Sequence, residues 1–289
     1  MSIKFVFFGT DPLAKDILDT LKSGGFLPTL IVAGQDTVDN KKNIILPTEK
    51  IWAQENNIEV FQPDKITKEI IEKLASYNAD VFIVASYGKI LPNTLLALPK
   101  HGVLNLHPSL LPTLRGPSPM RSAILNDIRD TGVSVMLLDE QMDHGPLLGQ
   151  KKVSITPWPQ RGSIVDTTLA KVGAELLLEV LPKWIEGTLT PTEQDHTKAT
   201  YCKEFKKKDG LIDLNDDAYK NYLKICAFDG WPGTYFFVSH NGRDIRVKIT
   251  EADYVENKLV LKKVIPEGKK EMSYDEFKRG YETKIENRK

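Results

Sequence analysis

An asparagine and a histidine stand two residues apart where an apolar stretch gives way to a polar loop. Asn105 and His107 end the apolar run that begins at Gly102, and the proline-containing segment 108–116 follows them. Side chains two residues apart on a strand share a face, and open α/β sheets bind ligands at the carboxyl ends of their strands. An amide donates to a developing oxyanion, and an imidazole moves a proton near neutral pH. The pair therefore predicts acid–base chemistry beside an oxyanion, with a turn cap and a surface imidazole as the plain alternative.

An acidic loop supplies candidates for a third polar group. Residues 138–146 end a predicted strand and contain Asp139, Glu140 and Asp143. A carboxylate within about 4–6 Å of an imidazole favours the protonated imidazole and can accept a proton from a nucleophile. The spacing does not choose among the three acids, and acidic loops are often simply solvated.

Other chemistries find less support in the sequence. A metal site built from His107, His144 and Asp143 would lack both a histidine pair four residues apart and clustered cysteines. The first predicted turn, 8–12, lacks the three-glycine dinucleotide fingerprint, and no glycine-rich loop ends in Gly-Lys-Ser/Thr, which argues against NAD and ATP. Ser109 is not framed by the glycines of a nucleophile elbow, so a covalent intermediate is unsupported. No metal is expected.

Strand-like and helix-like segments alternate through the first two thirds of the chain, which predicts a mostly parallel sheet with helices on both faces. The polar stretch 188–202 has no helical or strand period and is interpreted as a linker. Short apolar segments separated by tight turns then predict a small β-barrel. We therefore expect a Rossmann-like catalytic domain at 1–187 and an OB-like barrel domain at 203–289. The expected strands are 3–8, 29–33, 59–62, 80–85, 102–106, 133–138, 235–238, 245–249 and 258–264, and the expected helices are 12–22, 48–55, 67–76, 120–125, 164–186 and 218–226.

The composition of the 289 residues excludes several classes of protein. The 39 Lys and Arg balance the 39 Asp and Glu, so neither charge-driven disorder nor a globally basic coat for nucleic acid is indicated. Any polyanion must therefore meet a local patch. Cys202 and Cys226 are too few for a disulfide scaffold, which fits a reducing cytosol. No run approaches the roughly 18 apolar residues that span a bilayer, so we expect a cytoplasmic protein with no membrane partner.

Several motifs together resemble those of the folate-dependent formyltransferases. They are Asn105-x-His107, Ser109-Leu110-Leu111-Pro112-x-x-Arg115-Gly116, Thr131-Gly132-Val133 and Met142-Asp143-x-Gly145. In that superfamily an Asn, a His and an Asp form the catalytic set, which the resemblance maps onto Asn105, His107 and Asp143. It also implies 10-formyltetrahydrofolate as co-substrate, with segment 85–92 lining the pterin pocket. The residues expected to bind the folate are Tyr87, Gly88, Ile90, Leu91, Ser109, Leu110, Leu111 and Pro112.

The last third of the chain resembles the tRNA-contacting barrel of the superfamily members that formylate methionyl-tRNA. The residues that carry this resemblance include Thr200-Tyr201, Ala227-Phe228 and Trp231-Pro232-Gly233. The resemblance implies formyl transfer to the α-amine of methionine on initiator tRNA, by an enzyme expected to act as a monomer. The alternatives are a sugar-amine formyltransferase, a formyltetrahydrofolate hydrolase and a non-catalytic tRNA-binding protein.

Basic residues predict where the tRNA would bind. Residues 203–289 carry 19 Lys and Arg against 16 Asp and Glu. After Gln35, the family usually has an arginine- and glycine-rich loop that reaches the acceptor end of the tRNA, whereas residues 36–43 here offer only two lysines. Lysine is a point charge without the planar fork of arginine, so we expect these two lysines to add affinity more than discrimination. The residues expected to contact tRNA are Lys41, Lys42, Arg115, Lys206, Lys207, Lys208, Lys262, Lys263, Lys269 and Lys270.

Overall fold

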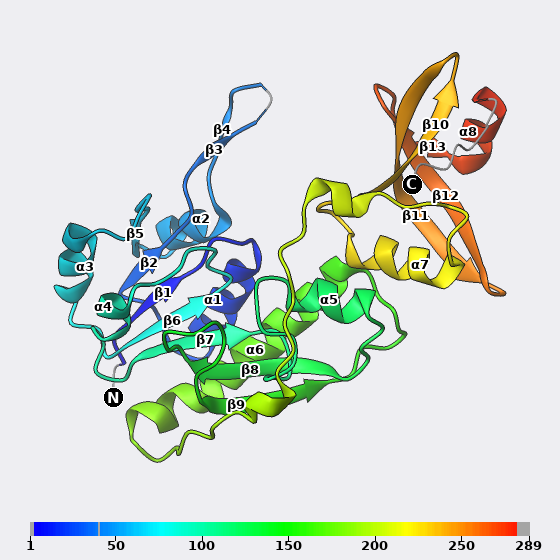
Figure 1. The fold of residues 1–289 in the computed structure, drawn as a ribbon. Coiled ribbons are helices and arrows are strands. Elements are labelled where there is room, and N and C mark those ends of the chain that lie inside the picture. The colour runs from blue at the N-terminus through cyan, green and yellow to red at the C-terminus, as the bar shows by residue number, and fades with distance from the viewer. Residues whose placement is uncertain (1–2, 40, 282–289) are drawn as a thin grey trace. The chain divides into compact units, whose positions relative to one another are not determined.

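The computed structural model describes residues 3–39 and 41–281, and a seven-stranded sheet forms the centre of its first part (Figure 1). The strand order is β5-β2-β1-β6-β7-β8-β9. The first five strands in this order run parallel, whereas β8 and β9 run antiparallel to their neighbours. The strands are β1 (Phe5–Phe8), β2 (Leu30–Val32), β5 (Glu59–Phe61), β6 (Val81–Ala85), β7 (Val103–His107), β8 (Thr131–Leu137) and β9 (Leu147–Val153).

One face of this sheet is covered by short helices that pack on the alternate residues of the strands. Val6 and Phe8 of β1 form a buried cluster with Leu74 and Leu95, which come from two of these helices. Val103 of β7 belongs to the same cluster, so this face continues toward the end of β7. The helices of the first part are α1 (Leu13–Ser23), α2 (Thr48–Glu55), α3 (Lys68–Ala75), α4 (Asn93–Leu96) and α6 (Gly162–Ile185).

The opposite face of β7 lies against α6. A Cβ atom on Gly173 of α6 would stand 2.6 Å from the side chain of Leu106, so the absence of a side chain there allows helix and strand to approach closely. Successive side chains of a strand point to opposite faces. Because Leu106 faces α6, Asn105 and His107 point together to the other face.

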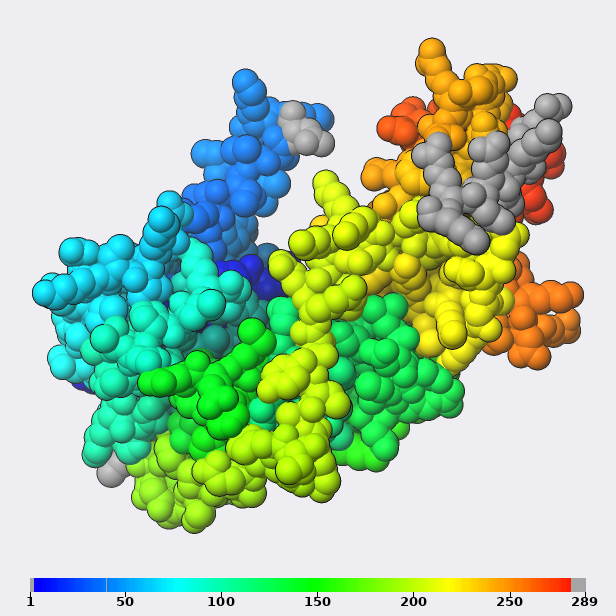
Figure 2. Space-filling model, in the orientation of Figure 1, coloured from blue at the N-terminus to red at the C-terminus, as the bar shows by residue number. Residues whose placement is uncertain are grey.

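A β-hairpin follows β2, where the sequence suggests a polar loop. Strands β3 (Thr37–Val38) and β4 (Ile44–Ile45) pair antiparallel and project from the sheet (Figures 1 and 2). Asp39 orders the turn, because its Oδ1 accepts the backbone N–H groups of Lys41 and Asn43 at 2.7 and 2.8 Å. Lys42 has a φ of 64°, in the left-handed region.

The last part of the chain is built on a four-stranded antiparallel sheet of order β10-β11-β12-β13. Its strands are β10 (Thr234–His240), β11 (Arg243–Val255), β12 (Lys258–Pro266) and β13 (Met272–Ser273). Phe236, Val247, Val264 and Phe277 pack on one face of this sheet and form its core. The helices α7 (Ala218–Ala227) and α8 (Tyr274–Gly280) accompany it.

The chain divides into two compact units that do not follow the sequence order. The sheet unit comprises residues up to Pro117, Asp130–Ser154 and Asp166–Cys202. The C-terminal unit comprises Ser118–Arg129, Ile155–Val165 and the residues from Lys203 on, and it includes α5 (Pro119–Leu125). The expected domain boundaries at 187 and 203 stay predictions.

One carboxylate joins all three segments of the C-terminal unit. Asp127 Oδ1 accepts hydrogen bonds from Trp158 Nε1 at 2.6 Å and from the Tyr219 hydroxyl at 3.0 Å. Although burial alone would raise it, these bonds and the one from Arg129 hold the pKa of Asp127 below its usual value. The segments Ser118–Arg129 and Ile155–Val165 are therefore linked to the C-terminal residues through the carboxylate of Asp127.

The predicted fold class is confirmed: a mostly parallel α/β sheet precedes a small C-terminal β unit. The helix expected at 12–22 is observed as α1, and Asp11 Oδ1 accepts the N–H of its first residue, Leu13, at 3.0 Å. The strand β9, the hairpin β3–β4 and the helix α8 were not among the expected elements. None of the described helices is long and apolar enough to cross a membrane.

Candidate active site

The three side chains expected to do chemistry lie together at the carboxyl end of β7. Asp143 Oδ1 is 3.5 Å from the amide nitrogen of Asn105, and Asp143 Oδ2 is 3.7 Å from His107 Nδ1. The His107 side chain is 5 % exposed and that of Asp143 is 13 % exposed. The site thus combines an amide donor, an imidazole and a carboxylate in a largely desolvated setting, where electrostatic interactions are stronger than in water.

One nitrogen of His107 is already occupied. His107 Nε2 lies 3.0 Å from the carbonyl oxygen of Leu114. A carbonyl oxygen only accepts, so Nε2 carries a hydrogen and donates it. Nδ1 is therefore the nitrogen that faces Asp143.

The structure distinguishes Asp143 from the two competing acids. Asp139 Oδ2 is 2.7 Å from His144 Nδ1, and Glu140 Oε1 accepts a 2.6 Å hydrogen bond from the amide of Asn93. Both are thus held by other partners, whereas Asp143 faces Asn105 and His107. The geometry favours Asp143, the acid that the family resemblance implies.

The loop that carries Asp143 is tightly held. Asp143 has a φ of 49°, and its Oδ2 accepts the backbone N–H of Gly116 at 2.7 Å. A Cβ atom on Gly145 would stand 2.0 Å from the carbonyl oxygen of Leu137, so this position tolerates only glycine. The spacing Met142-Asp143-x-Gly145 therefore lets the loop press against the end of β8.

The alternative metal site does not assemble in the described part of the chain. His144 pairs with Asp139, and its ring stacks on that of His196 at a centroid distance of 4.0 Å. His107 lies instead against Asp143. Among the described residues, no group of three or more His, Cys, Asp and Glu side chains is arranged to hold a metal ion.

The loop after His107 is fastened to the strands beneath it. The Ser109 hydroxyl donates to the Thr113 carbonyl at 2.6 Å, and the N–H of Leu111 donates to the Ser134 hydroxyl at 3.2 Å. Ser109 and Leu111 are 2 % and 3 % exposed, so their side chains offer almost no surface to a ligand. Of the folate residues expected in this loop, only Leu110 and Pro112 are partly open.

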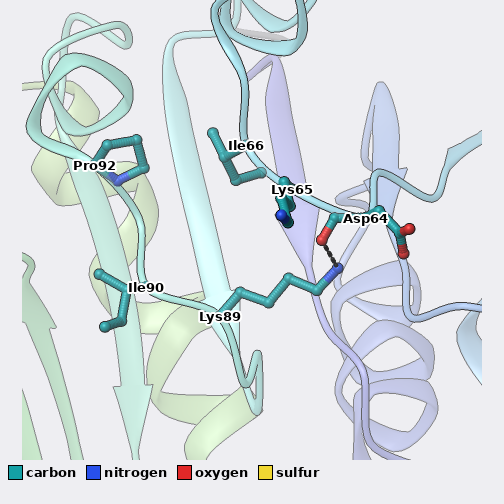
Figure 3. A pocket seen from close by; sticks show the side chains of 6 residues that line it. All are labelled: Asp64, Lys65, Ile66, Lys89, Ile90 and Pro92. Carbon is teal, nitrogen blue, oxygen red and sulfur yellow. Dashed lines mark hydrogen bonds between the residues drawn. The ribbon is translucent and has the colours of Figure 1, made fainter.

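A pocket of about 380 Å³ lies where two parallel strands end (Figure 3). Ile90, Lys89 and Pro92 of the expected folate segment line one part of it, and Lys89 donates its ammonium hydrogens to the carbonyls of Pro63 and Asp64 at 2.7 and 2.9 Å. The remaining lining residues, Asp64, Lys65 and Ile66, follow β5 and were missed by the sequence reasoning. Their place after a short strand is the signal that could have found them.

The rest of the expected pterin segment divides between surface and core. The Tyr87 ring packs edge-on against Phe8, with the ring centres 5.4 Å apart. Its hydroxyl is buried and has no hydrogen-bond partner among the residues that the structure describes, and burial raises the pKa of that phenol. Leu91 packs against the same buried cluster. Gly88 and Ile90 are exposed.

Arg115 lies inside the sheet unit rather than on its surface. The residue is 1 % exposed, and its guanidinium donates to Gln194 Oε1, His196 Nδ1 and the Tyr201 hydroxyl. This placement corrects the expectation of a tRNA contact, because a buried guanidinium cannot meet a phosphate. Sequence reasoning missed Gln194, which lies in the predicted linker.

The lysines expected to contact tRNA are exposed, but some of them already form ion pairs with carboxylates. Lys262 pairs with Asp253 at 3.4 Å, and Lys263 pairs with Glu251 at 2.8 Å. Of those expected in the C-terminal unit, five form no ion pair with any residue that the structure describes: Lys206, Lys207, Lys208, Lys269 and Lys270. Lys41 and Lys42 are exposed at the tip of the hairpin.

An aromatic and basic face of the C-terminal sheet adds residues that the sequence reasoning missed. Tyr235 and Phe237 of β10 stand opposite Lys248 and Arg246 of β11, and all four belong to the face away from the core. The Arg246 guanidinium lies 5.4 Å from the centre of the Tyr235 ring. The alternation from 234 to 238 is the signal that could have found this face.

Comparison with known proteins is consistent with this geometry. A family model described as formyl transferase matches residues 1–181, and a model of the formyl transferase C-terminal domain matches residues 204–259. The fold and the strand-end site thus define an enzyme of the formyltransferase class.

Curated relatives narrow the class. A methionyl-tRNA formyltransferase of Dictyoglomus turgidum is 34 % identical over 99 % of both chains, and one of Chloroflexus aurantiacus is 37 % identical over 87 % of this chain and 82 % of its own. One of Thermodesulfovibrio yellowstonii is 36 % identical over 96 % of both. The chain belongs to the methionyl-tRNA formyltransferase family.

Solved structures share the fold at lower sequence identity. A methionyl-tRNA formyltransferase from Clostridium thermocellum matches with a TM-score of 0.61 and 15 % identity, covering 91 % of this chain and 98 % of that one. A 4-N formyltransferase from Francisella tularensis matches with a TM-score of 0.63 and 20 % identity, covering 85 % and 96 %. These likenesses concern the fold alone.

Proposed function

We propose that the protein transfers the formyl group of 10-formyltetrahydrofolate to the α-amine of methionine on initiator tRNA. The observation that carries this proposal is the placement of Asp143 within 3.7 Å of both Asn105 and His107 at the end of β7, in a chain of the formyltransferase family. The three groups match the demands of acyl transfer to an amine: an oxyanion donor, a cationic partner and a proton acceptor.

In the proposed reaction, the neutral amine attacks the formyl carbon directly. The formyl oxygen becomes an oxyanion, which the Asn105 amide and the Nδ1–H of protonated His107 stabilise. Asp143 keeps His107 charged and accepts the amine proton through water. The oxyanion then re-forms the carbonyl as the bond between the formyl carbon and N10 breaks, and the proton taken up by Asp143 passes through water to N10, which leaves the formamide and tetrahydrofolate. Ser109 takes no part, because its hydroxyl donates to the Thr113 carbonyl.

The folate co-substrate is proposed to bind across the ends of the parallel strands. Gly88, Ile90, Leu110 and Pro112 offer accessible surface, whereas Ser109 and Leu111 are left out because they are buried. The pocket of about 380 Å³ adds Lys65, an ammonium that suits the carboxylates of the folate glutamate. The KM for the folate should therefore rise in a Lys65→Ala variant.

The tRNA is proposed to be bound by cations from both units. Phosphates are contacted by five lysines that form no ion pair with the described residues, namely Lys206, Lys207, Lys208, Lys269 and Lys270. Lys41 and Lys42 reach the acceptor end. Phosphate contacts of this kind give affinity rather than sequence discrimination. The aromatic and basic face of β10 and β11 suits stacking on an unpaired base. A monomeric, cytoplasmic enzyme completes the proposal.

One experiment separates this function from its rivals. The protein is incubated with 10-formyltetrahydrofolate and, in separate reactions, charged initiator tRNA, charged elongator tRNA, a nucleotide-linked amino sugar, or no acceptor. The proposal predicts formylation of the initiator Met-tRNA. Formylation of the sugar alone supports the sugar-amine reading, release of formate without acceptor supports the hydrolase reading, and tRNA binding without formylation supports the non-catalytic one.

A further inference from the structure

Arg115 is a buried cation that no carboxylate of the described residues neutralises. Within the described residues, it forms no ion pair inside 4 Å, and the groups that accept its hydrogen bonds are neutral. The shortest of these bonds runs from Nη2 to Gln194 Oε1 at 2.7 Å, and Nε donates to the same oxygen at 3.2 Å. Burying an unpaired charge is costly. The directional donors of the guanidinium are what distinguish it from an apolar side chain at this place.

Gln194 links Arg115 to the loop that carries Asp143. Its Nε2 donates to the carbonyl oxygens of Asp143 at 3.0 Å and Gly145 at 2.7 Å. Both hydrogens of the amide are therefore used, and its oxygen is held by Arg115. Gln194 is 5 % exposed, so water does not replace these bonds.

The residue after Arg115 contacts the side-chain carboxylate of the same Asp143. The N–H of Gly116 donates to Asp143 Oδ2 at 2.7 Å. The left-handed backbone of Asp143 is strained for a residue other than glycine and persists only where its surroundings fix it. Arg115 and Gly116 thus fix both ends of Asp143: its backbone carbonyl through Gln194, and its side chain directly.

We propose that Arg115 and Gln194 are positioning residues that hold Asp143 in reach of Asn105 and His107. The inference rests on the proposed function, because it assigns the pair a role in the reaction through Asp143. It also makes the segment after 188, interpreted from the sequence as a linker, part of the support of the active site.

The most selective variant is Gln194→Glu. The carboxylate keeps the shape of the side chain and still accepts from Arg115, now as an ion pair, but it cannot donate to the carbonyls of Asp143 and Gly145. We expect kcat to fall at least about tenfold, with the KM values for folate and tRNA changed less than about twofold, since misplacement of a reacting group acts on the chemical step. Arg115→Lys, which keeps the charge but loses the fork, should show the same kcat-against-KM pattern.

Two further readouts separate positioning from simple loss of structure. In the double variant Gln194→Glu/Asp143→Asn, the loss in kcat should scarcely exceed that of Asp143→Asn alone, because residues that act through one group are not additive. By hydrogen exchange, the Gly116 amide should lose protection at least about tenfold in Gln194→Glu. The Arg115 amide, which donates to the Thr200 carbonyl at 2.8 Å, should keep its protection and serves as the internal control.

The outcomes are distinguishable from a failure of the proposed function. If the wild-type protein formylates no Met-tRNA, the function is wrong, and the Gly116 exchange still tests the positioning claim. Unchanged kcat together with unchanged Gly116 protection in both variants overturns the inference. Equal loss of protection at Gly116 and Arg115, or fully additive losses in the double variant, overturns it as well, since either shows only a general structural role.

Discussion

His107 and Asp143 face each other through Nδ1 and Oδ2 at 3.7 Å, while the other nitrogen of the imidazole is bound to the Leu114 carbonyl. The ring therefore cannot turn without losing a buried hydrogen bond. Its fixed orientation directs Nδ1 to the carboxylate of Asp143, which the amide of Asn105 also approaches. A proton on Nδ1 and the amide of Asn105 can thus act on one oxygen.

Replacing the carboxylate should reveal which acid takes part in the reaction. We expect Asp143→Asn to lower kcat by roughly 10²- to 10⁴-fold, because a general base and the partner of the imidazolium are lost together. Asparagine tolerates a positive φ, so the backbone should be kept. Asp139→Asn and Glu140→Gln are the matched controls, and steady-state formylation is the measurement. The reverse ranking among the three variants would remove Asp143 from the mechanism.

The hairpin lysines should contribute affinity for tRNA. We test them with Lys41→Gln/Lys42→Asn, since asparagine accepts the left-handed conformation of residue 42. The KM for initiator Met-tRNA should rise, most clearly at low salt, with a smaller change in the ratio of initiator to elongator use. If the KM is unchanged at every salt concentration, the hairpin has no role in tRNA binding.

The lysines of the C-terminal unit should differ according to their ion pairs. Charge removal at Lys206, Lys207 and Lys208 should weaken tRNA binding. The slope of log K for tRNA binding against log salt concentration should become shallower by roughly 0.7–0.9 for each phosphate that is no longer neutralised. Lys262→Ala/Lys263→Ala is the matched control, because both ammonium groups already face carboxylates. Binding is measured across a salt series. Equal slopes for the first variant and the wild-type protein would mean that these three lysines only solvate the surface.

Asp127 should make stability depend on pH. Its pKa is lowered on folding, so its contribution is present above the unfolded value near 3.9 and is lost as the pH falls through the folded value. Asp127→Asn should cost about 1–2 kcal/mol of unfolding free energy at pH 7, from weakened charged hydrogen bonds, and much less near pH 3. Urea unfolding measures both.

Asp130→Asn is the control for that stability measurement. Its carboxylate pairs with Lys152, and both side chains are largely exposed, so the ion pair contributes little. The account of Asp127 fails if Asp127→Asn loses the same free energy at both pH values, or no more than this surface control loses.

The parts of the site that follow from local spacing could be predicted from the sequence. Asn105 and His107 share a face because side chains alternate along a strand, and the end of the strand is marked by the polar loop. The choice of Asp143 could not be made from spacing. It depends on which of the three acids other side chains engage, and those partners, Asn93 and His144, are placed by the folded chain.

Elements that depend on distant contacts were harder to predict. An arginine followed by glycine in a polar loop suggests a surface cation. Arg115 is buried instead because Gln194, which is distant in the sequence, lies beside it in the folded chain. The strands β3 and β4 have two residues each, too few for a period to be detected. The association of 118–129 and 155–165 with the C-terminal residues likewise has no local signal, since Asp127, Trp158 and Tyr219 meet only in the folded chain.

The most direct test of the central claim is the turnover of Asn105→Ala with 10-formyltetrahydrofolate and initiator Met-tRNA. Removing an oxyanion donor should lower kcat by roughly 10²- to 10³-fold, with folate binding largely kept. Folate affinity is measured in the same preparation, so that a loss of activity is not mistaken for a loss of the co-substrate. A kcat close to that of the wild-type protein would contradict the account, because the amide at the end of β7 would then have no part in the reaction.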